Sequence, residues 1–191
     1  MKQGQKILIG AAVVGGLLIA ANSSKGYSKL TNNQKEYVAL LHPAVRASFI
    51  SFILEVQKRT GLIVKITSAY RSWAKQASLY AENSKNARPG HSHHNYGLAI
   101  DINLLDPKTG HVILRKASTT YAWEKTGIVK IAKKYGLNWG GYFKSYHDPI
   151  HFYFAYDTSK LKERAIDTFC GGRNTSSCPS KVFGNKVKLV A

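Results

Sequence analysis

Acidic residues are scarce in this chain of 191 residues, because ten Asp and Glu stand against 28 Lys and Arg and give a formal net charge of +18. Cysteine is also scarce, with two in the whole chain, and the sequence has neither internal repeats nor a heptad period. These absences exclude disulfide scaffolds, repeat proteins and coiled coils. Hydrophobic residues make up 44% of the chain and aromatic residues 11%, so a core can form and global disorder is excluded.

The excess of positive charge indicates a polyanionic partner, which could be nucleic acid, anionic lipid or an acidic cell-wall polymer. The sequence has no helix-turn-helix, zinc-finger or RNA-recognition motif, so specific nucleic-acid binding finds no support. We therefore expect anionic wall polymers or lipids as partners, and no specific nucleic acid.

Residues 1–25 differ in composition from the rest of the chain. A short basic start precedes residues 7–21, which carry no polar side chain. This order is typical of an export signal, although the apolar run is shorter than the roughly 20 residues that span a bilayer. A cleaved signal peptide, a weak uncleaved anchor and a small-residue helix that packs against other helices all stay open. We expect membrane contact through residues 7–21 and an exported or membrane-associated protein, in the cell envelope, periplasm or virion, rather than a purely cytosolic one.

Hydrophobic periodicity predicts an α+β fold in which helices flank a small antiparallel sheet. The expected helices cover residues 31–41, 45–60, 74–82 and 122–135, and the expected strands cover 62–66, 97–105 and 151–156. We expect one folded domain over residues 26–165 and a basic, Gly- and Ser-rich tail over 166–191. In an exported protein, Cys170 and Cys178 of this tail could close a small disulfide loop.

Histidine and aspartate residues coincide with two of the expected strands. Asp101 lies on the polar face of the strand over 97–105, and His151 opens the strand over 151–156. If both strands belong to one sheet, these side chains can meet, with His94 in the turn before the first strand. Two imidazoles and a carboxylate form a common catalytic zinc site. Spacing alone leaves open that they are ordinary surface or hydrogen-bonded groups.

Three motifs in order resemble those of VanY-like, LAS-type zinc peptidases (peptidase family M15). Residues 92–101, SHHNYGLAID, resemble the SxHxxGxAxD signature of that family. Residues 148–151, DPIH, resemble its second motif, which follows a Trp-Gly-Gly triplet here as in the family. Residues 67–72, TSAYRS, with Gln76 shortly after, resemble the S-G-Y-R-S…Q segment. The resemblance implies the LAS or hedgehog-type fold, with the L-alanyl-D-glutamate endopeptidases of phage endolysins as the nearest group.

The resemblance also implies roles for individual residues. His94, Asp101 and His151 would bind one Zn²⁺ per chain, Asp148 would be the general base, and Arg71 would hold a substrate carboxylate. Four further residues are expected to contact substrate in the pocket: Gln76, His147, Trp139 and Tyr96.

The function implied by the resemblance is hydrolysis of peptidoglycan stem peptides at the L-alanyl-D-glutamate bond, in cell-wall degradation by a phage-encoded enzyme. Two alternatives stay open. One is a D-alanyl-D-alanine carboxypeptidase, which shares the zinc core. The other is a membrane-tethered module of a virion or wall that binds without turnover, although retention of the ligands and the base argues against it.

Overall fold

The computed structural model describes residues 25–173, 177–178 and 182–189. Within this part of the chain, the strands form one five-stranded antiparallel sheet in the order β1-β2-β5-β4, with β3 paired to β2. The α+β class with a small antiparallel sheet is thereby confirmed. The strands are β1 (Ile63–Ser68), β2 (Ala99–Leu105), β3 (Val112–Leu114), β4 (Asn138–Trp139) and β5 (His151–Tyr153).

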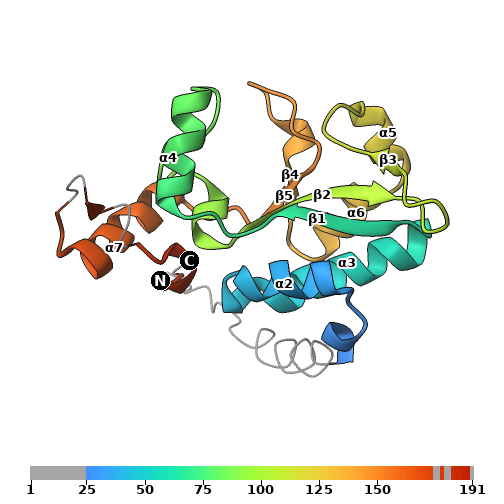
Figure 1. The fold of residues 1–191 in the computed structure, drawn as a ribbon, viewed down its shortest axis with the longest axis horizontal. Helices are drawn as coiled ribbons and strands as arrows, with labels where there is room; N and C mark the ends of the chain where they lie inside the picture. The colour runs from blue at the N-terminus through green and yellow to red at the C-terminus, as the bar shows by residue number, and fades with distance from the viewer. Residues whose placement is uncertain (1–24, 174–176, 179–181, 190–191) are drawn as a thin grey trace, which may run out of the picture.

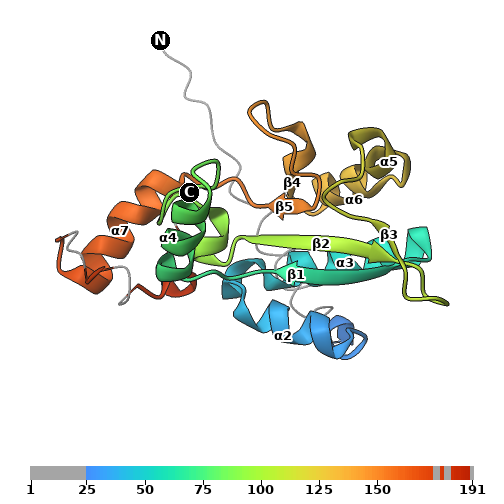
Figure 2. The same ribbon diagram turned by 45° about the horizontal axis from the view of Figure 1, so that its top comes forward.

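Helices lie on both sides of this sheet. The α-helices are α2 (Asn32–Leu40), α3 (Arg46–Thr60), α4 (Trp73–Glu82), α5 (Thr120–Lys125), α6 (Ile128–Lys134) and α7 (Thr158–Cys170). Short 3₁₀ turns are η1 (Pro43–Val45), η2 (His93–Tyr96), η3 (Gly140–Tyr142) and η4 (Gly184–Lys186). Helices α2 and α3 run along one side of β1 and β2, while α4 rises from the other side and α7 lies at the end of the molecule (Figure 1; Figure 2).

The first helices begin and end where local chemistry dictates. Thr31 caps α2 in a capping box with Gln34, which satisfies backbone N–H groups that lack partners within the helix. Pro43 starts η1 after the interruption expected between the two helices. Gly61 ends α3 in the left-handed conformation, with φ of 70°, as glycine does at helix ends.

Strand β2 divides the molecule into a core side and a site side. Ile100 and Ile102 are fully buried, and on the same side the rings of Phe52 from α3 and Phe152 from β5 lie 5.0 Å apart. Because successive side chains of a strand point to opposite faces, Asp101 faces away from this core. The apolar packing therefore holds β2 in the register that presents Asp101 to the other side.

Two predicted elements are shorter in the structure than expected. The helix expected over 122–135 is two helices, because Gly127, with φ of 76°, separates α5 from α6. The strand expected over 151–156 ends at Tyr153, which pairs with Ala99 and Asn138. The regular ladder ends here because β2 and β4 begin at these residues, and one further backbone bond joins Phe154 N to the carbonyl oxygen of Leu98 at 2.9 Å.

The segment expected as a tail packs on the domain. Helix α7 continues across the expected boundary at residue 165 to Cys170, which forms a disulfide with Cys178 over a Cα–Cα distance of 5.6 Å. Cys178, Val182 and Val187 are all buried in the core. The apolar residues of this segment stand among Gly, Ser and Lys without a regular period, so only the surface that they cover shows that they belong to the core.

Residues 7–21, expected to contact a membrane, lie outside the described residues. None of the helices in the described part of the chain has the length and apolar character of a membrane span. The expectation for residues 7–21 therefore stays a prediction.

The turn before β2 yields a test of the fold. Gly97 has φ of 65°, and a Cβ there would lie 2.6 Å from the backbone nitrogen of His42. We expect Gly97→Ala to lower the free energy of unfolding by about 3 kcal/mol or more, since backbone strain adds to overpacking. Gly110→Ala is the matched control, because φ there is 72° but no atom lies within 4 Å. Urea unfolding of both variants measures the difference, and equal losses would contradict the packing argument.

Candidate active site

The antiparallel ladder between β2 and β5 places Asp101 directly opposite His151. Asp101 Oδ1 lies 2.9 Å from His151 Nδ1. Both side chains point away from the core, so two strands present a carboxylate and an imidazole to one spot. This is the meeting that the alternation of residues 97–105 predicts.

His94 completes the cluster from η2. Its Nε2 lies 3.1 Å from Asp101 Oδ1 and 3.2 Å from His151 Nδ1. Its Nδ1 lies 2.5 Å from the carbonyl oxygen of Ala69, which can only accept, so we assign the N–H to Nδ1. The Nε2 lone pair then faces the cluster.

These three residues fit a metal ion. Their ligand atoms all lie within 4.8 Å of one another, and two imidazole nitrogens with one carboxylate oxygen are donors that zinc accepts. Burial raises the pKa of the Asp101 carboxyl, but the imidazoles of His94 and His151 outweigh burial and hold this pKa well below its usual range. The carboxylate is thus ionised, as a ligand must be.

The neighbouring His93 points elsewhere. Its Nε2 lies 3.2 Å from the carbonyl oxygen of Tyr156, and its ring centroid is 4.6 Å from that of Tyr153. Burial, followed by the charge of His151, lowers the pKa of His93 to about 4. In this pair of adjacent histidines, His94 is therefore the one that faces the cluster.

Local hydrogen bonds hold η2 in place. The Ser92 side chain caps the turn in a capping box with Asn95. The backbone nitrogen of Arg71 donates to the carbonyl oxygen of His94 at 2.9 Å, and Asn95 Nδ2 donates to the carbonyl oxygen of Arg71 at 2.8 Å. The turn that carries His94 and the segment that carries Arg71 are thereby joined.

The turn over residues 148–151 is fixed as firmly. The His151 backbone nitrogen donates to the Asp148 carbonyl oxygen at 3.1 Å, and Trp139 Nε1 donates to that of Pro149 at 2.7 Å. The backbone of Gly140 lies so close to this turn that a Cβ on residue 140 would lie 2.6 Å from the Asp148 carbonyl oxygen. The Trp-Gly-Gly triplet thus supplies the support and the close approach that this turn needs.

The Asp148 carboxylate is largely buried beside the metal-binding cluster. Its Oδ1 is buried and receives no hydrogen bond from the described residues. The ammonium group of Lys116 lies 3.4 Å from the same oxygen, an ion-pair contact without hydrogen-bond geometry. The phenol of Tyr146 is a further neighbour, and burial together with the charges of Asp148 and Asp101 raises its pKa.

Arg71 is oriented by polar side chains. Its Nη1 donates to Gln76 Oε1 at 3.0 Å and its Nη2 donates to Ser68 Oγ at 3.1 Å, while Nη2 lies 3.6 Å from Asp101 Oδ2. The buried Gln76 in turn donates to the carbonyl oxygen of Ala87 at 2.7 Å. The guanidinium group is held beside the cluster with donors left for a ligand.

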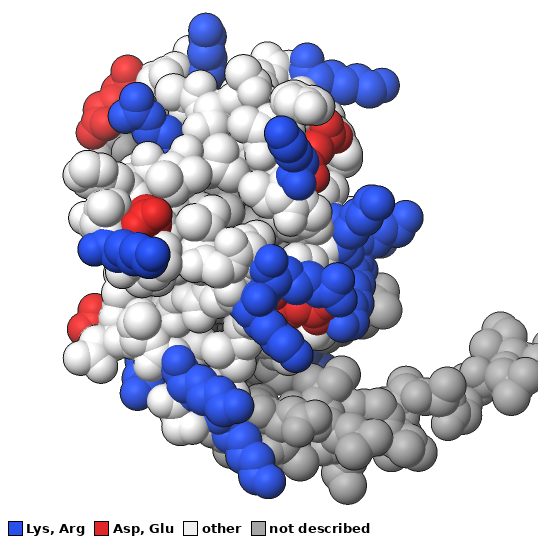
Figure 3. Space-filling model, turned by 90° about the vertical axis from the view of Figure 1, so that its right-hand side faces the viewer, with Lys and Arg blue, Asp and Glu red and all other residues white. Residues whose placement is uncertain are grey.

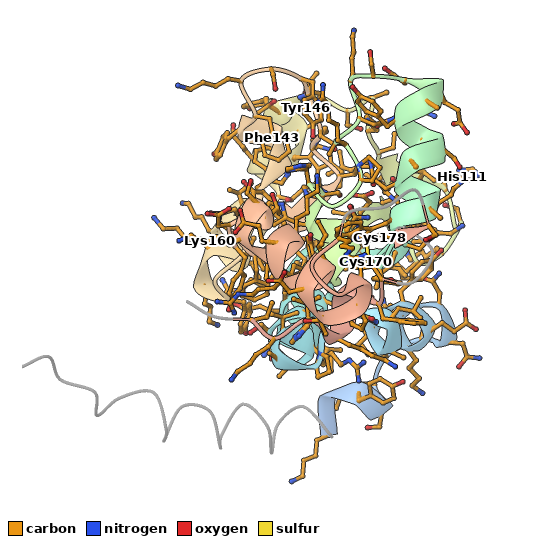
Figure 4. All side chains as sticks on the ribbon, turned by 90° about the vertical axis from the view of Figure 1, so that its left-hand side faces the viewer. His111, Phe143, Tyr146, Lys160, Cys170 and Cys178 are labelled. Carbon is orange, nitrogen blue, oxygen red and sulfur yellow. A yellow bond between two sulfur atoms is a disulfide. The ribbon has the colours of Figure 1, made fainter. Side chains whose placement is uncertain are left out.

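A cavity of about 490 Å³ brings these groups together. It lies on the side of the sheet from which α4 rises (Figure 1), and Phe143 and Tyr146, which lie close together in Figure 4, border it with ring centroids 5.3 Å apart. Seven of the residues singled out in the sequence line it: Arg71, Gln76, His94, Asp101, His147, Asp148 and His151. His147 Nε2 also lies 2.9 Å from the carbonyl oxygen of Ser118.

Two expected pocket residues are not in the wall, and that expectation was wrong. Tyr96 is fully buried, and its hydroxyl donates to the carbonyl oxygen of Gly90 at 2.8 Å. Trp139 is also buried, with its ring stacked on Phe152. Both residues support the site from the core, because a large ring next to a motif residue packs on whichever side the backbone directs it.

The lining residues that sequence reasoning missed include Lys85, Lys116 and Tyr146. Lys116 follows β3, a strand that the periodicity did not predict. No spacing to the motifs points to it, since loops decide its approach to Asp148. A lysine-rich chain also offers no reason to single out one lysine.

The fold and the His-Asp-His cluster together define a metal-dependent hydrolase of mixed α+β architecture. A family model described as D-alanyl-D-alanine carboxypeptidase matches residues 85–154. The peptidoglycan L-alanyl-D-glutamate endopeptidase CwlK of Bacillus subtilis strain 168 is 34% identical over 124 residues, which cover 58% of this chain and 71% of CwlK. The chain belongs to the peptidase M15 family, whose members are zinc-dependent, and it is a metallopeptidase.

A solved structure supports the same fold. The crystal structure of the Serratia marcescens L-Ala D-Glu endopeptidase ChiX matches with a TM-score of 0.50 and 21% sequence identity, covering 66% of this chain and 89% of ChiX. At this identity the likeness concerns the fold alone.

The adjacent histidines give a matched test of the metal centre. We expect His94→Ala to raise the dissociation constant for zinc more than about 100-fold. Mutation of a residue that only hydrogen-bonds a metal ligand already lowers metal affinity 10–100-fold, and loss of the ligand itself should lower it more. His93→Gln should change it less than about tenfold, since that ring faces Tyr156. Competition with a chromophoric chelator measures both constants. Equal losses in the two variants would contradict the assignment.

Proposed function

We propose that this chain hydrolyses peptidoglycan stem peptides at the L-alanyl-D-glutamate bond, as a zinc-dependent endopeptidase. The observation that carries the proposal is one cavity that holds a His-Asp-His cluster, a buried carboxylate and an oriented arginine. The names of the relatives CwlK and ChiX support the choice of bond.

In this proposal His94, Asp101 and His151 hold the zinc ion. When bound, zinc supplies Lewis acidity, which lowers the pKa of a water molecule and polarises the scissile carbonyl. The chain supports this chemistry by fixing the donors: His94 donates from Nδ1 to Ala69, and the strand ladder aligns the other two residues.

Asp148 acts as the general base. Asp148 lines the cavity that also holds the cluster, so its carboxylate can accept a proton from the attacking water. The carboxylate can then return the proton to the leaving amine nitrogen. The ammonium group of Lys116 lies 3.4 Å from Asp148 Oδ1 and adds positive charge beside the base.

Arg71 binds a carboxylate of the substrate. Gln76 and Ser68 hold two arms of its guanidinium group and leave further N–H donors of the planar fork for an anion. Lys85 and Lys116 add positive charge to the same cavity. A stem peptide, which carries carboxylates at D-Glu and at its terminal D-Ala, complements this charge.

The second candidate function is a D-alanyl-D-alanine carboxypeptidase, favoured by the description of the matching family model. Both reactions use the same metal centre and the same base. The two reactions differ in where the cleaved peptide bond lies relative to the substrate carboxylate that Arg71 binds.

Mass spectrometry of purified peptidoglycan digested with the full chain tests these functions. We expect new D-Glu amino groups that disappear on zinc chelation, and an Asp148→Asn variant about 10²–10⁴-fold slower with zinc still bound. Asp167→Asn, on the exposed face of α7, is the matched control with unchanged rate. Release of D-Ala alone would favour the carboxypeptidase. Absence of any product with zinc bound would favour a binding module of the wall or virion.

We further propose that the basic face between α3 and α6 binds anionic wall polymers or lipids. Two adjoining hollows of about 420 and 720 Å³ lie on this face, and Figure 3 shows Lys and Arg side chains gathered around an acidic group on the side of the molecule where α3 ends. Among the described residues, six exposed cations line them: Lys25, Lys29, Lys58, Arg59, Lys130 and Lys134.

One acid, Glu55, lines both hollows in the described part of the chain. Hydrogen bonds from Lys134 and Tyr135 lower its pKa to about 2, so it stays ionised and offsets one of the six charges. In the sequence, Lys25 lies four residues after the end of the segment expected at the membrane. Membrane contact through residues 7–21, export to the cell envelope and cell-wall degradation by a phage-encoded enzyme extend this proposal and rest on the sequence.

Substitution of three lysines on the basic face tests this binding. We expect Lys29→Gln, Lys58→Gln and Lys130→Gln together to weaken binding to purified walls or anionic vesicles about 100-fold at low salt, at about 1 kcal/mol per cation. The control changes three exposed lysines elsewhere: Lys75, Lys108 and Lys160. Sedimentation against salt concentration measures both sets. Salt-independent binding, or equal loss in the control, would argue against the proposal.

A further inference from the structure

The C-terminal strap, residues 182–189, returns from α7 toward α2 (Figure 1). Its apolar residues Val182 and Val187 are buried in the core, while Lys188 is exposed. The strap contributes no residue to the lining of the catalytic cavity. Any influence that it has on the site must therefore act through the residues on which it packs.

The strap is hydrogen-bonded to the segments around the zinc-peptidase motifs. Asn185 Nδ2 donates to the carbonyl oxygen of Leu40 at 3.0 Å, and His42 Nε2 lies 3.1 Å from the carbonyl oxygen of Val187. Arg164 Nη1 donates to the carbonyl oxygen of Lys188 at 3.4 Å. These contacts join the strap to α7 and to the end of α2.

The closest approach is to η2, the turn that carries His94. A Cβ at Gly184 would lie 1.8 Å from the carbonyl oxygen of Asn95 and 3.3 Å from the ring of Tyr96. Glycine is therefore the residue that lets the strap lie directly against the turn. The strap supports η2 from the side away from the cavity.

Hydrogen bonds carry this support to the ligand. The ring of His42 contacts Val187 of the strap, and its backbone nitrogen donates to the carbonyl oxygen of Gly97 at 3.0 Å. Asn95, against which Gly184 packs, donates to the carbonyl oxygen of Arg71. A displacement of the strap would loosen the C-terminal part of η2 and its cap at Gly97, next to His94.

The disulfide anchors the strap to the domain. It fixes the fully buried Cys178 to the last residue of α7. With the bond closed, three residues separate Val182 from a fixed point, whereas without it eleven separate Val182 from Cys170. A shorter free span costs less entropy when the strap docks.

We propose that the C-terminal strap is a positioning element for His94, and that the Cys170–Cys178 bond controls zinc retention by keeping the strap docked. The inference rests on the proposed metal role of His94. It assigns to the disulfide and to Gly184 a function in the catalytic centre that the cavity lining does not reveal.

Two variants test the proposal in the full chain: Gly184→Ala, and the pair Cys170→Ser with Cys178→Ser. We expect each to raise the zinc dissociation constant about 10–100-fold, the range for partners of metal ligands. Amide hydrogen exchange at residues 93–97 of the zinc-free protein should quicken at least tenfold, while exchange in β2 stays unchanged. The disulfide is removed by substitution and not by chemical reduction, because thiol reductants themselves bind zinc. Lys188→Ala is the matched control within the strap, with no change expected.

Zinc affinity within twofold of the parent in both variants, or exchange that quickens equally in β2, would overturn the proposal. If Gly184→Ala does not fold, the serine pair and Asn185→Ala decide the outcome. Neither measurement uses substrate, so the result is independent of which peptide bond the enzyme cleaves. Unchanged zinc affinity overturns the strap proposal whatever the variants do to cleavage, whereas absence of cleavage by the zinc-bound parent would count against the proposed function alone.

Discussion

The antiparallel pairing of β2 with β5 is the constraint on which the active site depends. It puts Asp101 opposite His151 at hydrogen-bond distance, and a shift of one residue would turn one of the two side chains into the core. The register is held from the other side of the sheet, where Ile100 and Phe152, also paired, are fully buried. The same hydrophobic packing that stabilises the domain therefore aligns two of the three metal ligands.

The other residues of the site lie on turns, and contacts other than strand pairing must hold these turns rigid. Backbone carbonyl groups serve this purpose: Ala69 accepts from His94, and Pro149 accepts from Trp139. Glycines permit the close approaches, as Gly140 does beneath the turn over residues 148–151. Such positioning makes the donors ready before any ligand arrives, which is how catalytic groups contribute most.

Lysine and arginine side chains occur in two separate environments in this molecule. In the cavity, Arg71 and Lys116 lie beside the carboxylates of Asp101 and Asp148, where positive charge can serve recognition of an anionic substrate. On the α3–α6 face the cations are exposed and mostly without acidic partners, a setting suited to long-range attraction of a polyanion. The net charge of the chain cannot distinguish these settings, although they act at different ranges and on different partners.

Much of the site could be predicted from residue patterns, because its chemistry is local in sequence. Alternation around Asp101 predicts that its side chain can meet His151, and the resemblance of residues 92–101 and 148–151 to the family motifs implies the ligands and the base. The residues that end helices can also be recognised from local sequence, as Gly61 at the end of α3 illustrates. The break at Gly127 was not predicted, since an isolated glycine within a helical pattern is often tolerated.

Contacts between distant segments were decided by the tertiary structure alone. Lys116 reaches Asp148 over a loop, Tyr96 and Trp139 turn into the core, and the strap packs its Gly184 against Asn95. None of these contacts has a characteristic spacing or composition. By itself the sequence determined which side chains can do the chemistry, because that depends on residue type and local periodicity. The tertiary structure decided what surrounds and supports them, because packing depends on surfaces that meet only when the whole chain has folded.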